Sequence, residues 1–168
     1  MRATIEGTGA GTGAAVTRSI GLTGRVVVGG TVSAGLLLGG YTVAAMALAG
    51  RINGNGLVLT SLGLFIIGSA AGLLVSTVVG LVGREAGVSW GEAGRRVAKG
   101  VLYAIPACAV GAVLAGWIAM AIMGLYLGRV GPIAGTLIAA LIGLVVIAAT
   151  FRATCGCCRN AARRWWQD

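Results

Sequence analysis

The chain has 168 residues, of which 57% are hydrophobic and only 10% are charged, and its net charge is +9. A soluble domain carries about 25% charged residues, so this composition excludes an ordinary soluble protein and indicates a membrane protein. Histidine is absent, which removes the commonest general base and metal ligand.

Residues 1–25 are polar and rich in glycine and threonine. A cleavable signal peptide needs an apolar stretch directly after a basic start, and the first 20 residues contain none. We therefore expect a flexible, retained cytoplasmic tail. Arg2 and Arg18, with few acids around them, would also suit a mitochondrial presequence, although the glycines oppose the amphipathic helix that such a segment forms.

The first two predicted spans cover residues 26–50 and 57–83, and a polar, glycine-rich turn at 51–56 separates them. The first span contains a GxxxG pair, and the second carries a small residue at every fourth position. In lipid, small side chains let two helix backbones approach closely, which favours helix association. The predicted packing residues are Gly35 and Gly39 in the first span and Gly68, Gly72, Ser76 and Gly80 in the second.

The third span is predicted at residues 101–128, after a basic loop at 84–100. The sequence Ser-Trp-Gly-Glu at 89–92 has the pattern of a capping box, which predicts a surface helix that runs on into the span. Pro106 is expected to kink that helix. Small residues also dominate a ladder in this span whose members are four residues apart: Ala104, Cys108, Ala112, Gly116, Met120, Gly124 and Gly128.

The fourth span is predicted at residues 130–151, with Gly135, Ala139 and Gly143 four apart. A basic tail, 152–168, follows it. Tryptophan and arginine side chains beside a span suit either the lipid headgroup region or the surface of a partner protein. The residues assigned to such a surface are Trp90, Arg95 and Arg96 in the loop and Arg163, Arg164, Trp165 and Trp166 in the tail.

Basic residues are distributed unequally between the two ends of the predicted bundle. All of the 13 except Arg51 and Arg129 fall on the side that holds both termini. The positive-inside rule predicts that this side is cytoplasmic, and it explains the net charge without nucleic acid as a partner. We expect the inner membrane of a bacterium, with the inner membrane of an organelle as the alternative.

The predicted spans contain no Asp, Glu, Lys, Arg or His. Proton-coupled and ion-coupled carriers and rotary proteolipids depend on ionisable groups inside the membrane, so rotary proteolipids and most proton-coupled transport are excluded. Catalytic triads that use histidine are impossible, and we expect neither an enzyme nor a bound cofactor. The serine, threonine and tyrosine hydroxyls in the spans could line a path for a solute, but such groups more often bond to the backbone or to a neighbouring helix.

Cys155, Cys157 and Cys158 form the one cluster of reactive side chains. They are weak candidates for a metal site, since a closed zinc site takes four ligands at paired spacings. The nearby Arg152 and Arg159 favour redox reactivity or, in a eukaryotic cell, S-palmitoylation. The simplest interpretation is three free thiols in a reducing compartment.

The sequence therefore predicts an all-α membrane protein, a bundle of four transmembrane helices with short outer turns and an amphipathic inner loop. The function expected first is a non-catalytic structural or accessory subunit. It would pack against larger integral membrane protein subunits in the lipid bilayer and aid the assembly or stability of a complex. The alternatives are a small homo-oligomeric pore or facilitator for an uncharged solute, and a thiol-based or acylated membrane organiser.

Overall fold

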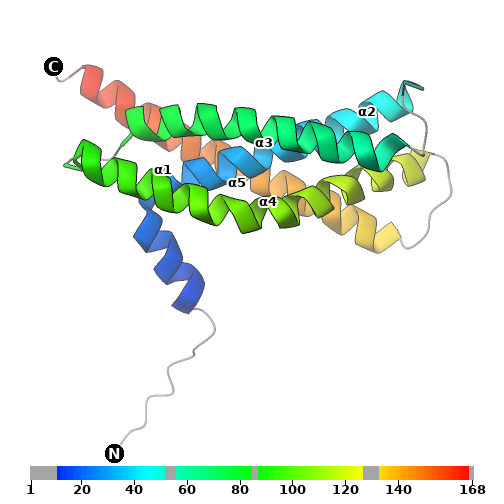
Figure 1. Ribbon diagram of the computed structural model, residues 1–168, viewed down its shortest axis with the longest axis horizontal. Helices are drawn as coiled ribbons and strands as arrows, with labels where there is room; N and C mark the ends of the chain where they lie inside the picture. The colour runs from blue at the N-terminus through cyan, green and yellow to red at the C-terminus, as the bar shows by residue number, and fades with distance from the viewer. Residues whose placement is uncertain (1–10, 52–55, 85–86, 127–132, 167–168) are drawn as a thin grey trace, which may run out of the picture.

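The computed structural model describes residues 11–51, 56–84, 87–126 and 133–166, and in these residues the protein is an all-α bundle (Figure 1). Four segments are long and apolar enough to cross a membrane: Gly21–Leu48, Leu57–Val82, Trp90–Gly124 and Leu137–Arg163. The elements are α1 (Gly11–Leu36), the π-helical segment η1 (Leu37–Thr42), α2 (Val43–Leu48), α3 (Leu57–Val82), α4 (Trp90–Tyr126) and α5 (Ile133–Trp165). The predicted fold class is confirmed.

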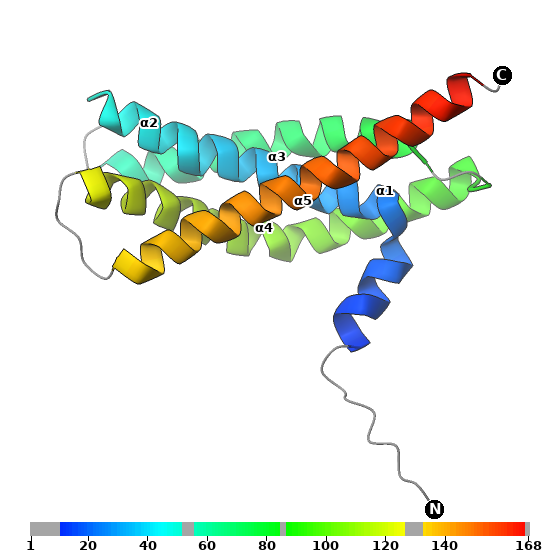
Figure 2. The same ribbon diagram turned by 180° about the vertical axis from the view of Figure 1, so that it is seen from behind.

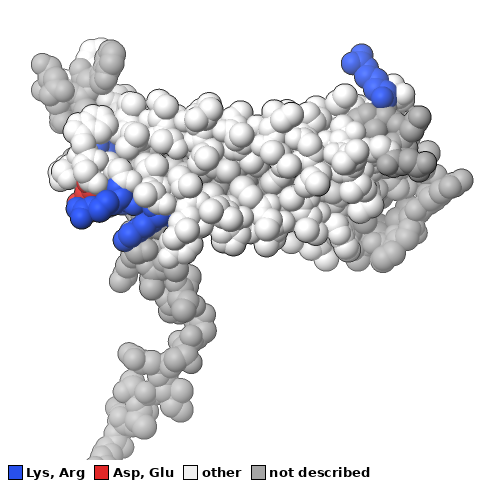
Figure 3. Space-filling view, in the orientation of Figure 1, with Lys and Arg blue, Asp and Glu red and all other residues white. Residues whose placement is uncertain are grey.

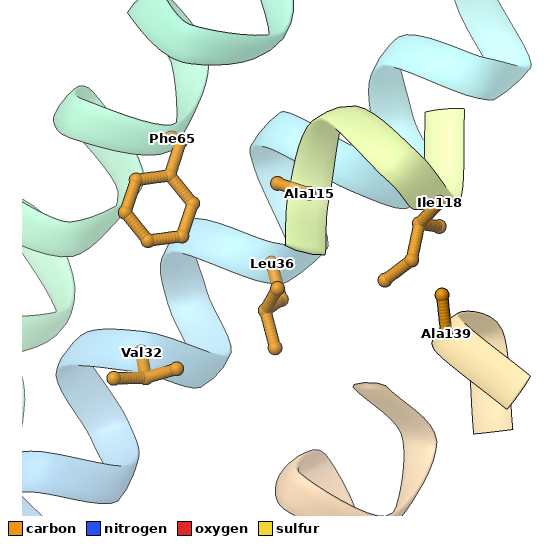
Figure 4. Packing of buried hydrophobic residues seen from close by; sticks show 6 residues of the cluster. All are labelled: Val32, Leu36, Phe65, Ala115, Ile118 and Ala139. Carbon is orange, nitrogen blue, oxygen red and sulfur yellow. The ribbon is translucent and has the colours of Figure 1, made fainter. Parts of the chain in front are cut away.

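The first span is the centre of the bundle. Over an apolar stretch of 18 residues in each span, 56% of the first span is buried, against 22%, 28% and 11% for the three spans that follow it. Helices α3 and α4 pack on α1 and on each other, while α5 crosses them diagonally (Figure 2). The main core cluster forms where these helices meet, and it consists of Val32, Leu36, Phe65, Ala115, Ile118 and Ala139 (Figure 4).

Small residues set the distance between α1 and α3. A Cβ placed on Gly72 would lie 2.5 Å from the carbonyl oxygen of Gly30, and one placed on Gly68 would lie 2.5 Å from that of Ala34. Real Cβ atoms do not approach a carbonyl oxygen this closely, so the two backbones can touch only because these positions lack a side chain. The four-residue ladder of the second span thus faces the central helix.

The N-terminal segment differs from the prediction of a flexible tail over residues 1–25. Helix α1 begins at Gly11, and residues 1–10 lie outside the described part of the chain. At Gly21 the backbone takes φ 60° and ψ −169°, and the preceding helical turns leave the bundle steeply (Figure 1). Glycine adopts a positive φ without the steric cost of a Cβ, which is why the change of direction falls at this residue.

The C-terminal boundary also differs from the prediction, because α5 continues through the predicted tail to Trp165. Alanine and arginine are frequent in this part of the chain and favour a helix, and no proline interrupts it. Its far end packs against α3, where a Cβ placed on Gly83 would lie 2.7 Å from the Cα of Cys157. Tertiary contact therefore extends the helix beyond its apolar stretch.

Helix α4 begins at Trp90 and joins the predicted surface helix and third span in one element. The Ser89 hydroxyl accepts a hydrogen bond from the Glu92 backbone N–H at 3.2 Å, as the capping pattern predicts. The Glu92 carboxylate does not complete the capping box, because it pairs with Arg96 at 2.7 Å. The helix continues without interruption through Pro106.

Candidate functional site

Many hydroxyl groups inside the spans are hydrogen-bonded within the bundle. Five bonds link different helices, and Thr31, Thr42 and Thr154 bond to a carbonyl of their own helix. The links between helices are Thr23 to the Gly80 carbonyl at 3.2 Å, Ser33 to Thr150 at 2.9 Å, Tyr41 to the Ala140 carbonyl at 2.8 Å, Ser61 to the Gly39 carbonyl at 2.6 Å and Ser76 to the Val27 carbonyl at 3.4 Å. Among the described residues, Ser69 Oγ is the only buried side-chain polar atom without a partner. These groups join the helices and leave little polar surface for a solute.

The π-helical segment η1 is the main irregularity inside a span. A π turn breaks the usual pattern of backbone bonds, and Ser61 of α3 donates to the Gly39 carbonyl there at 2.6 Å. Thr42 donates to the Leu37 carbonyl at 2.9 Å. The sequence analysis missed this segment, although the adjacent pair Gly39 and Gly40 beside two mid-span hydroxyls was a signal for it.

The predicted packing residues of the first two spans lie between α1 and α3. Gly35 and Gly39 face Phe65, and the α3 ladder of Gly68, Gly72, Ser76 and Gly80 is buried. In α5, Ala139 is buried, and a Cβ on Gly143 would lie 2.8 Å from Ile118 Cδ1. Gly135 belongs to α5, but its surroundings lie outside the described part.

The predicted ladder on α4 makes contacts within the chain only in its first part. Ala104 is buried, and Cys108 and Ala112 pack against the main core cluster. Nothing lies within 4 Å of a Cβ placed on Gly116, and Met120 is exposed. A step of four residues overshoots the helical turn by about 40°, so a long ladder winds away from its neighbour. The buried positions Ala104, Gly111 and Ile118 are instead seven apart, a spacing that stays on one face.

One end of the bundle is strongly basic (Figure 3). Its described basic residues are Arg25, Arg84, Arg95, Arg96, Lys99, Arg152, Arg159 and Arg163, whereas Arg51 lies at the other end. Arg84 lies over the ring of the exposed Trp90, 3.6 Å from its centre. The Arg96 side chain runs beside Gly21, where a Cβ would lie 2.7 Å from Nη1.

The residues predicted to form a lipid or partner surface divide into two groups at this end. Trp90 and Arg95 are exposed on α4, and Arg96 is partly buried. Directly after α5, Trp166 is 90% exposed, and within the helix Arg163 donates to the Asn160 side chain at 2.8 Å. The side chains of Arg164 and Trp165 lie outside the described part.

The cysteines do not converge on a common point. Cys157 is buried against Gly83, while Cys155 and Cys158 are exposed. On a helix, positions i and i+3 share a face while position i+2 points away from both, which separates Cys157 from Cys155 and Cys158. Over the described residues, no group of three or more His, Cys, Asp and Glu side chains could hold a metal ion, so the weak metal-site candidate fails.

Two lateral cavities flank the place where α5 crosses α1. The crossing is close, since a Cβ on Gly29 would lie 2.5 Å from Thr150 Oγ1. One cavity, of about 400 Å³, lies between α1, α3 and α5 and is almost entirely apolar. The other, of about 550 Å³, lies between α1 and α5, and Arg25 and Arg152 are part of its lining. Sequence reasoning missed both, because no motif marks them.

Comparison with known protein families, with characterised proteins and with solved structures gives no match for this chain.

Proposed function

We propose that the protein is a non-catalytic accessory subunit that packs, within the bilayer, against larger integral membrane proteins. The observation that carries the proposal is the uneven burial of its spans. The first span is 56% buried, whereas the last is 11% buried. A bundle built around one helix leaves the outer faces of its other helices available to neighbours.

The exposed faces of α3 and α5 carry large aliphatic side chains, among them Leu59, Leu74, Leu141 and Val145. Lipid covers such surfaces equally well, so they do not by themselves identify a protein partner. The outer face of α4 is different, because Gly116 lies open beside the exposed Trp117. A glycine next to a large aromatic side chain on a membrane-facing helix suits a second helix better than fluid acyl chains.

The chemistry of the described residues supports a non-catalytic role. The interior of the bundle is filled by Val26, Val27, Leu36 and Val43, each at most 1% exposed. The cross-helix hydroxyls bond to one another or to backbone carbonyls. This packing gives no support to a solute path through a single bundle. The pore alternative would therefore need a path between several copies of the chain, and an experiment must test that form.

Native purification in mild detergent tests the proposal directly. The protein should migrate with larger membrane proteins, which mass spectrometry would identify. Gly116→Leu should weaken that association while leaving the bundle intact, and Gly63→Leu, at another open glycine on α3, is the matched control. Migration as a single small species, together with solute flux in liposomes, would favour the pore instead.

The placement of both termini on the cytoplasmic side, in a bacterial inner membrane or an organelle inner membrane, is part of the same proposal. It is supported by the basic end of the bundle and the positive-inside rule. In intact cells, an impermeant maleimide should not label the exposed Cys155 and Cys158, but should label a cysteine placed at Arg51. Labelling of the native thiols from outside would reverse the orientation.

The tail residues enter the proposal as a docking element for the partner. Removing residues 163–168 should leave membrane insertion and thermal stability unchanged but reduce co-purification. Unchanged co-purification would assign Arg163, Trp166 and their neighbours to the lipid headgroup region.

A further inference from the structure

The cavity between α1 and α5, which we call the arginine groove, has a charged end and an apolar end. Arg25 of α1 and Arg152 of α5 both line it, although they come from opposite ends of the chain. Val28 and Gly29 lie one turn deeper on α1, and Ala149 and Val146 lie one and two turns deeper on α5. On both walls of the groove, the arginine lies nearest the basic end of the bundle, and the apolar residues lie deeper in the bundle.

The dimensions of this gradient suit an amphiphile. From position 152 to position 146, α5 rises about 9 Å at ~1.5 Å per residue. The groove holds about 550 Å³, within the roughly 300–1,000 Å³ of small-molecule sites. Arg25, Arg152 and Ala149 are exposed, so the groove can be reached from outside the bundle.

The described charges around the groove favour an anion. Basic residues gather at this end of the bundle, and the one acidic side chain among the described residues, Glu92, is paired with Arg96. Guanidinium groups bind phosphate through planar, paired hydrogen bonds. The groove therefore offers two phosphate-binding side chains at the depth where the apolar part of the bundle begins.

We propose that the arginine groove binds one anionic phospholipid of the adjacent leaflet. The phosphate lies with Arg25 and Arg152, and one acyl chain runs along Val28, Gly29, Val146 and Ala149. A free phosphate ion would use the arginines but not the apolar wall, and a neutral lipid would use the wall but gain less from the charges. This inference does not depend on the proposed accessory role.

The site can be tested by native mass spectrometry of the detergent-solubilised protein titrated with phosphatidylglycerol or phosphatidylcholine. The wild type should bind one phosphatidylglycerol in preference to phosphatidylcholine. Each of Arg25→Gln and Arg152→Gln should weaken phosphatidylglycerol binding about five-fold, and the double variant about 25-fold, from the usual contribution of a basic residue near anionic lipid.

The matched control is the double variant Arg95→Gln, Lys99→Gln, which removes two exposed charges from the same end of the bundle but outside the groove. It should change binding less than two-fold. An equal loss in this control would assign binding to general surface charge and overturn the site.

A second variant, Ala149→Phe, fills the apolar wall at an exposed position and keeps both arginines. It should abolish phosphatidylglycerol binding without lowering the thermal unfolding temperature. Unchanged binding in Ala149→Phe, equal binding of phosphatidylcholine by the wild type, or full displacement of the lipid by excess inorganic phosphate would each overturn the proposal. Should a glutamine variant unfold, the Arg→Lys variants at both positions keep the charge and must retain the lipid preference.

Discussion

Two parts of the bundle are built in opposite ways. Between α1 and α3, backbone approaches backbone, with Gly68 and Gly72 against the carbonyl groups of Ala34 and Gly30. Helix α5 instead crosses α1 with a close approach at Gly29 and Thr150, and a cavity lies on each side of this point. The α1–α3 interface holds the core of the bundle together. The α1–α5 interface leaves two cavities that a small molecule could enter.

This comparison indicates how a chain with few large buried side chains holds together in lipid. Apolar burial gives no preference for a helix partner over acyl chains, so close van der Waals contact and hydrogen bonds decide which helices associate. The α1–α3 pair has both, through its glycines and through Thr23 and Ser76, and Ser61 adds a bond from α3 to η1. Helix α5 depends on isolated contacts, and substitutions should therefore affect the two interfaces differently.

The largest expected effect is at the α1–α3 contact. Gly72→Leu forces a side chain against the Gly30 backbone, which cannot move aside, and should cost about 3 kcal/mol or more of stability. Gly63→Leu on the same helix meets nothing within 4 Å and should stay within ~0.5 kcal/mol of the wild type. Thermal unfolding in detergent measures both, and equal stability of the two variants would contradict the interface.

A smaller change distinguishes the two interfaces. Gly68→Ala places a methyl group against a backbone oxygen and should cost about 2 kcal/mol. Gly143→Ala meets the flexible end of Ile118, and the higher helix propensity of alanine, worth up to ~1 kcal/mol, should offset most of its cost. If Gly143→Ala proved the more damaging of the two, α5 would be the tighter interface.

Individual hydrogen bonds should have effects of intermediate size. Ser61→Ala removes the donor that reaches the Gly39 carbonyl in the π-helical segment, and it should cost about 1–1.7 kcal/mol, near the upper end for membrane proteins. Tyr41→Phe removes the bond to the Ala140 carbonyl of α5 and should cost about 0.6 kcal/mol. Chemical denaturation in mixed micelles would show which variant loses more stability. A larger loss in Tyr41→Phe would contradict the view that α3 is held more tightly than α5.

The smallest effect concerns the outer face of α4. Gly116→Leu should change the stability of the isolated protein by less than ~0.5 kcal/mol, since the position is open. Gly111→Leu on the same helix would meet Phe65, whose Cζ lies 2.9 Å from a Cβ there, and should cost ~1–3 kcal/mol. A destabilised Gly116→Leu protein, purified alone, would restore the ladder as an internal contact.

The sequence was sufficient to predict the number of spans, their approximate limits and the inward face of α3. Charge-free apolar stretches determine the first two, and a short ladder of small residues identifies the third. The buried face of α4 could not be predicted from its pattern of small residues, because a ladder of seven members winds around the helix. The helical extension to Trp165 is favoured by its alanines and arginines, but its contact with α3 through Cys157 and Gly83 is not visible in any local pattern.

The candidate lipid site was beyond sequence reasoning for a similar reason. In the sequence, Arg25 is the last residue of the predicted N-terminal tail and Arg152 is the first residue of the C-terminal one. Their position in one cavity depends on the angle at which α5 crosses α1 and on the absence of a side chain at Gly29. Neither the crossing angle nor the resulting space follows from hydropathy.

The change of direction at Gly21 gives the molecule a sidedness that four upright helices would lack. Residues 11–20 form about 15 Å of helix at ~1.5 Å per residue, and they leave the bundle on one side only (Figures 1 and 2). With the spans upright in a bilayer, this segment projects sideways at the basic end, from one flank of the bundle only. One glycine therefore makes the two flanks of the molecule unlike, so that any contact within the plane of the membrane would differ between them.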